Sequence, residues 1–180
     1  FNGGIIMAIY YGDGSNSSNG RLIQTVQFNY TGSYSAGSGL QSILTGAYIQ
    51  PKVASSKILV TMSIGRISGP SDSVAARVLR DRGGTDITAI GIHTSSGNWT
   101  NVSWQNYGKG PINDDHADGH TWQWWDTHGD SVGHSCYYTL QLWGQDAGTI
   151  YVNRTQNSNN SNHAYSARTG SAIILQEIAA

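Results

Sequence analysis

Hydrophobic and polar residues alternate along most of the chain with a period of two, which is typical of half-buried β-strands. Turn-forming clusters of Gly, Asp, Asn and Ser separate most of these stretches. The pattern predicts about ten strands: Leu22–Phe28, Leu40–Ile49, Lys57–Ile64, Val74–Arg80, Thr88–His93, Trp99–Tyr107, Thr121–Trp125, Cys136–Trp143, Thr149–Val152 and Ala172–Ile178. It therefore predicts an all-β fold for residues 21–180, a two-sheet β-sandwich of the jelly-roll type.

Residues 1–20 form a separate N-terminal extension in this interpretation. Ile5–Tyr11 has the pattern of a strand that is apolar on both faces, and the polar, flexible tether Asp13–Gly20 follows it. A detached strand of this kind exposes apolar side chains and unpaired backbone groups. We therefore expect it to occupy a groove, either in its own domain or in a neighbouring subunit. The predicted assembly residues are Ile5, Ile6, Met7, Ile9, Tyr10 and Tyr11.

The composition excludes several classes of function. Charged residues make up 12% of the 180-residue chain and the net charge is -1. The chain thus lacks the basic stripe that a nucleic-acid partner requires. Its apolar runs are too short to span a membrane. The single cysteine, Cys136, excludes an intrachain disulfide and is predicted to be a buried strand residue.

Several segments resemble a family of small β-sandwich structural proteins of aquatic bacteriophages and related filament-forming jelly rolls. The similar segments are Leu22–Gln27, Pro51–Ile64, Arg77–Ile87, Trp125–Thr127, Ile150–Arg154 and Ala172–Ile178. The resemblance implies a virion-associated or extracellular structural role and supplies no catalytic residues. Phe1–Gly20 and Asn113–His134 depart from it.

One acidic loop has features of a metal site. Asp114, Asp118 and Gly119 resemble the start of a calcium loop, but His116 fills the second ligand position and Trp125 the twelfth. An EF-hand requires a bidentate glutamate there, so that interpretation fails. We favour a solvated loop whose aspartates form turns. A loop-bound Ca²⁺ at Asp114 and Asp118 is the alternative, and no other cofactor is predicted.

The sequence shows no convincing catalytic motif. Glu177 is its only glutamate, so a paired-carboxylate mechanism would depend on aspartates. No Gly-x-Ser-x-Gly motif marks a nucleophile. We predict that the protein is not an enzyme.

The tryptophans and the glycosylation triplets each have two interpretations. Alternation places Trp122 and Trp124 on one face and Trp125 on the other, and we assign Trp99, Trp122 and Trp124 to a subunit interface or a sugar-binding platform. Asn-x-Ser/Thr triplets are glycan acceptors in a secreted protein, although a chain rich in these residues also produces them by chance. They begin at Asn16, Asn29, Asn98, Asn101, Asn153 and Asn159.

Taken together, these patterns predict a structural subunit of an extracellular or virion-associated filament or fibre. It would assemble with copies of itself when Ile5–Tyr11 inserts into a neighbour. The alternative is a carbohydrate-binding module or a receptor-binding fibre tip that uses exposed tryptophans and has surface glycans as partners.

Overall fold

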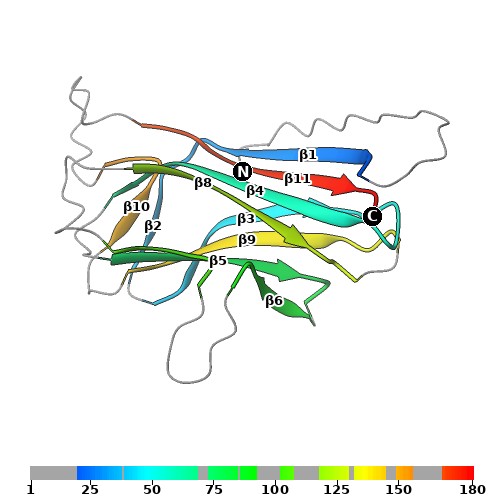
Figure 1. Ribbon diagram of the computed structural model, residues 1–180. Coiled ribbons are helices and arrows are strands. Elements are labelled where there is room, and N and C mark those ends of the chain that lie inside the picture. The colour runs from blue at the N-terminus through cyan, green and yellow to red at the C-terminus, as the bar shows by residue number, and fades with distance from the viewer. Residues whose placement is uncertain are drawn as a thin grey trace.

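The computed structural model describes residues 20–37, 39–68, 73–84, 86–92, 102–107, 118–129, 132–144, 149–155 and 168–180. These residues form antiparallel strands and the loops between them (Figure 1). Among them, no helix is long and apolar enough to cross a membrane. The predicted strand Ile5–Tyr11 and the tether up to residue 19 lie outside the described ranges.

The first sheet has six strands, and five of them follow the order β1-β11-β4-β10-β2. The sixth, β8, pairs with β4 on the side opposite β11. All of its pairings are antiparallel. The strands are β1 (Leu22–Tyr30), β2 (Tyr34–Ala36), β4 (Lys57–Ser68), β8 (Asp118–Asp126), β10 (Ile150–Val152) and β11 (Ser171–Ile178).

The second sheet has five strands in the order β3-β9-β5-β6, and β7 pairs with β5 next to β6. The strands are β3 (Gln41–Ile49), β5 (Ser73–Asp81), β6 (Ile87–Ile90), β7 (Trp104–Tyr107) and β9 (Cys136–Gly144).

The connections between the sheets are those of a jelly roll. The four-stranded body of the first sheet is β1-β11-β4-β8, and the second sheet is β3-β9-β5 with β6 and β7. Most successive long strands lie in opposite sheets, as Greek-key connections require. This confirms the predicted fold class. The sequence did not predict β2, because three residues are too few to show an alternating pattern.

The core lies between the two inner faces. Alternate residues of each central strand are buried, for example Ile173 and Leu175 on β11 and Leu140 and Leu142 on β9. Burial of such a side chain stabilises the fold by about 1.5–3 kcal/mol. Cys136 is fully buried opposite Ile49, as predicted.

Trp124 packs inward from β8 against Gly91, the residue after β6. Gly91 has a φ of 63°, and a Cβ atom built there would overlap the Trp124 ring. Glycine is therefore needed at position 91 for two reasons, its left-handed backbone and the space that the ring occupies.

We predict that Gly91→Ala destabilises the protein more than Gly83→Ala does. Gly83 has a similar φ of 73° but open space around its Cα, so alanine there adds only backbone strain of about 1–2 kcal/mol. Alanine at position 91 adds the overlap with Trp124, about 1–3 kcal/mol more. Urea unfolding followed by tryptophan fluorescence measures both variants. Equal free energies of unfolding would contradict the packing of Trp124 on Gly91.

Candidate functional site

Among the described residues, the buried charged side chains lie at one end of the sandwich. Asp126, Ile58, Glu177 and Gln24 are successive partners across β8, β4, β11 and β1. All four are buried, and three of them are polar. A buried charge is tolerated only when it is paired and hydrogen-bonded, so this row has to be satisfied by nearby donors.

Glu177 is the centre of one hydrogen-bonded cluster. Its Oε1 accepts hydrogen bonds from Ser56 Oγ (2.7 Å) and from the backbone N–H groups of Lys52 (2.8 Å) and Val53 (2.9 Å). Its Oε2 accepts one from Gln24 Nε2 at 2.6 Å. The carboxylate therefore fixes the loop that carries the chain from β3 in the second sheet to β4 in the first.

Asp126 is the centre of a second cluster that joins the two sheets. Arg80 Nη1 on β5 lies 2.6 Å from its Oδ1, and the Tyr138 hydroxyl on β9 donates to its Oδ2 at 2.7 Å. Burial and the neighbouring Asp126 carboxylate raise the pKa of Tyr138 far above its ordinary value of 10.0. Tyr138 is therefore a neutral donor, and Asp126 connects the edge strand β8 to β5 and β9 of the second sheet.

Ser56, His128 and Glu177 have the residue types of a hydrolase triad but not its geometry. In a triad the histidine stands between the serine and the carboxylate. Here Ser56 Oγ stands in the middle, 3.2 Å from His128 Nε2 and 2.7 Å from Glu177 Oε1. Ser56 is 2% exposed and His128 is fully buried, so no substrate reaches either group. The arrangement holds two loops together and has no nucleophile available for catalysis.

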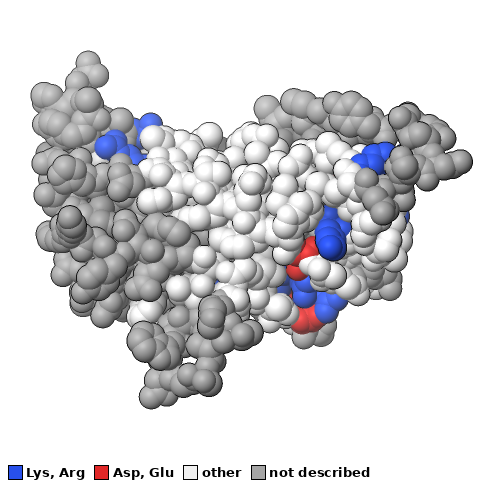
Figure 2. Space-filling view, in the orientation of Figure 1, with Lys and Arg blue, Asp and Glu red and all other residues white. Residues whose placement is uncertain are grey.

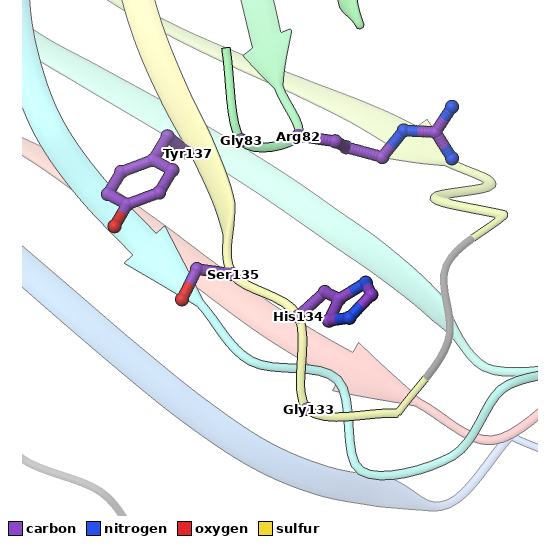
Figure 3. A pocket seen from close by; sticks show the side chains of 6 residues that line it. All are labelled: Arg82, Gly83, Gly133, His134, Ser135 and Tyr137. Carbon is purple, nitrogen blue, oxygen red and sulfur yellow. The ribbon is translucent and has the colours of Figure 1, made fainter. Parts of the chain in front are cut away.

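A half-open depression of about 450 Å³ lies at the same end (Figure 3). The Tyr137 ring and the Ser135 hydroxyl lie on one side of the segment that leads into β9, while His134 and Arg82 extend to the other side. Arg82 is also engaged by Asp86 and by the His128 carbonyl. These polar groups do not converge on one point, as a small-ligand site requires.

Trp122 and Trp124 face inward and are only half-buried, so their assignment to an interface or a sugar platform stays a prediction. They lie opposite the fully buried Met62 and Val60 of β4 and pack against the core. Trp125 is the outward residue and is 57% exposed. The alternation along β8 was predicted correctly, but the inward face was decided by the pairing with β4.

The strand edges are the other prominent surface. Within the described chain, β1 and β8 bound the body of the first sheet, and β3 bounds the second. The sequences of β1 and β3 contain no charged residue, and in β8 the charges are confined to its terminal residues, Asp118 and Asp126. On the face drawn in Figure 2, the charged side chains of described residues lie toward the two ends, and the surface between them is uncharged.

Two of the predicted glycan positions, Asn29 and Asn153, lie among the described residues and differ in their exposure. Asn29 is exposed near the end of β1. Asn153 is buried, and its Nδ2 donates to the carbonyls of Tyr30 (2.9 Å) and Gly32 (3.0 Å). A glycan on that amide is incompatible with this packing, which corrects the prediction for Asn153.

Other predicted site residues lie outside the described residues, namely Asn16, Asn98, Trp99, Asn101, Asp114 and Asn159. Asp118 begins β8. Among the described side chains, no group of three or more His, Cys, Asp or Glu residues could hold a metal ion. The loop-bound Ca²⁺ therefore stays a prediction.

Comparison with solved structures finds several similar chains. No protein-family model matches the sequence, and no curated protein matches it. A chain in the solved "Structure of infectious bursal disease virus Gx strain" is 12% identical, with a TM-score of 0.36 over 87% of this chain and 37% of that chain. The resemblance to proteins of aquatic bacteriophages stays a prediction.

We predict that Tyr138→Phe removes part of the alkaline sensitivity of the fold. Because the pKa of Tyr138 is raised on folding, its contribution is fully present below about pH 10 and is lost as the pH rises further. The variant is expected to be less stable by about 1–3 kcal/mol at pH 8, since Asp126 loses a donor. That difference should shrink by up to about 1.4 kcal/mol per pH unit above pH 10.

Urea unfolding at pH 8, 10 and 11 measures the effect, with Tyr137→Phe on the outer face as the control. A difference between Tyr138→Phe and the natural protein that stays constant with pH would contradict the role of Tyr138.

Proposed function

We propose that the protein is a repeating structural subunit of an extracellular or virion-associated filament or fibre. Subunits join when Ile5–Tyr11 of one copy adds to a strand edge of the next, and the tether Asp13–Gly20 spans the junction. The partners are copies of the same chain.

The observation that carries this proposal is the character of the sheet edges. Proteins that stay monomeric protect edge strands with charges, prolines or bulges. The described edges β1 and β3 have no charged residue or proline, and β8 has neither between Gly119 and Trp125. Register shifts interrupt the pairing of β1 at its start and of β3 at two places, whereas His120–Asp126 of β8 pair without one. The described polar clusters hold the fold together, and an uncharged strand edge is the described feature that supports assembly.

We predict that changing Ile5, Met7 and Ile9 together to Asn abolishes assembly. Each of these side chains is expected to contribute about 1.5–3 kcal/mol when buried. The loss corresponds to assembly that is weaker by about a thousandfold or more. Light scattering and negative-stain electron microscopy of the full chain measure the particle size.

The control carries three substitutions to Asn in the tether, at Ser15, Ser17 and Ser18, and should assemble normally. Particles of unchanged size and number in the Ile5/Met7/Ile9 variant would show that the strand does not join subunits.

Trp125 supports a second candidate function, a carbohydrate-binding or receptor-binding domain at a fibre tip. Its ring is 57% exposed on the outer face of β8, and the polar residues Thr121 and Gln123 lie on the same face. Exposed aromatic rings with nearby hydrogen-bonding groups are suited to stacking on sugars.

We predict that, in this case, the protein binds specific glycans on an array and that Trp125→Ala abolishes the binding. Ile87→Ala is the matched control, because Ile87 is a similarly exposed apolar residue on the other sheet, at 60%. Absence of glycan binding by the natural protein would reject this second function.

A further inference from the structure

Of the described strand edges, β1 and β8 are the most regular. On β1, Gln24–Tyr30 pair with Glu177–Ser171 of β11 without a register shift. The β8 edge is regular over the same length. Its residues from His120 to Asp126 pair with Ile64 to Ile58 of β4 without a register shift. The pairing of β3 with β9 shifts at two places, and β6 and β7 are each four residues long. A regular edge is the better template for an added strand, because its backbone groups are evenly spaced.

The β1 edge is less accessible than the β8 edge because side chains from the second sheet pack against it. Phe28 on β1 contacts the Tyr48 ring on β3, with ring centroids 5.8 Å apart. The Tyr30 hydroxyl donates to the Thr45 carbonyl on β3 at 3.0 Å. These contacts connect the edges of the two sheets at that side of the sandwich.

The β8 edge is also aromatic on both of its faces. On the inner face, His120, Trp122 and Trp124 form a stack, with ring centroids 5.7 Å and 6.1 Å apart, and each is only half-buried. On the outer face, Trp125 stands beside a depression of about 370 Å³ that Lys57 and Ile178 also line. A strand added at this edge would meet aromatic rings on both sides.

We propose that the β8 edge receives Ile5–Tyr11 of a second copy, in an antiparallel arrangement that places Ala8 opposite Gln123. This inference rests on the proposed function and names the acceptor surface for it. Ile5–Tyr11 has seven residues, as does the regular stretch from His120 to Asp126, and each spans about 20 Å between its end residues. Ile5–Tyr11 is apolar on both faces, and β8 offers His120, Trp122 and Trp124 on its inner face and Trp125 on its outer face. Cross-strand aromatic and β-branched pairs would therefore form on each side.

This register gives each donor side chain a defined neighbour. Ile9 and Met7 lie opposite Trp122 and Trp124 on the inner face. Ile6 lies opposite Trp125 on the outer face.

The tether argues that the donor comes from a second copy. Gly20 lies just before β1, and its N–H donates to the Ala179 carbonyl at 2.8 Å. A strand added beside β8 would lie four strand spacings from β1, across β11, β4 and β8. Those four spacings amount to about 19 Å across the sheet. In the antiparallel arrangement Tyr11 lies a further 20 Å along β8, so the separation from Gly20 is about 28 Å.

The chain from Tyr11 to Gly20 spans nine residue spacings and is rich in Gly, Ser and Asn. A flexible chain of this length has a root-mean-square end-to-end distance of about 15–18 Å and a fully extended length of about 30–32 Å. Pairing within one chain would thus require a nearly fully stretched tether. A second copy avoids this cost, and every described strand pair in the domain is antiparallel.

A charge placed on the β8 edge tests the proposal in the full-length chain. Gln123→Lys is expected to raise the concentration at which half of the chains are assembled by about tenfold or more. Gln27→Lys is a matched control, because Gln27 lies in the same row of the sheet on the opposite edge, β1. Each glutamine donates a side-chain hydrogen bond to a neighbouring polar residue, Gln123 to Thr61 and Gln27 to Asn29.

Disulfide trapping provides a second measurement that does not depend on the stability of the lysine variant. In a directly opposed antiparallel pair the Cα atoms are about 4.5–5.5 Å apart, within the range that a disulfide requires. Chains with Ala8→Cys and Gln123→Cys should therefore form an oxidised ladder of dimers and higher species on a non-reducing gel. Chains with Ala8→Cys and Gln27→Cys should not.

The outcomes separate this inference from the proposed function. Loss of assembly in the Ile5/Met7/Ile9 variant, with unchanged assembly in Gln123→Lys and no ladder from Ala8→Cys with Gln123→Cys, would overturn the β8 acceptor and leave the proposed function standing. An intramolecular crosslink in single chains would overturn the exchange between copies. A ladder that forms only with the cysteine at position 123 would support the acceptor.

Discussion

The buried carboxylates at one end of the sandwich constrain the rest of the described structure. Asp126 and Glu177 lie in the same inward-facing row, where an ionised group must be fully hydrogen-bonded. Glu177 meets this requirement by holding the loop between β3 and β4, and Asp126 by binding Arg80 and Tyr138 across the sandwich. Removal of one partner would leave a buried charge uncompensated, which is far more costly than a lost surface contact.

The Asp126 cluster also explains how an edge strand can be both open and ordered. Within the described chain, β8 has a backbone partner on one side only, β4. Asp126 adds a connection from the end of β8 to β5 and β9, and Trp124 adds packing on Gly91. The strand is therefore held in place although β4 is its only pairing partner among the described strands. A preformed edge lowers the ordering cost of adding another strand.

Much of the fold followed from the alternation of polar and apolar residues, because a two-sheet sandwich buries one face of each strand. The site was harder to predict, because partner strands decide which face is buried. Alternation separated Trp124 from Trp125, but only the pairing with β4 shows that Trp124 is the inward residue. The burial of Glu177 could have been predicted from the sequence, since Glu177 continues the inward-facing series of Ile173 and Leu175 along β11. His128 lies in a loop without periodicity, so its burial depends on tertiary contacts that the sequence does not show.

A cryo-electron microscopy map of the assembled particle, made from the full-length chain, tests the central claim most directly. The account predicts a repeating array of jelly rolls in which Ile5–Tyr11 of each subunit forms an additional antiparallel strand on β8 of its neighbour. A map in which that segment pairs within its own subunit, or a preparation that contains only single subunits at every concentration tested, would contradict it.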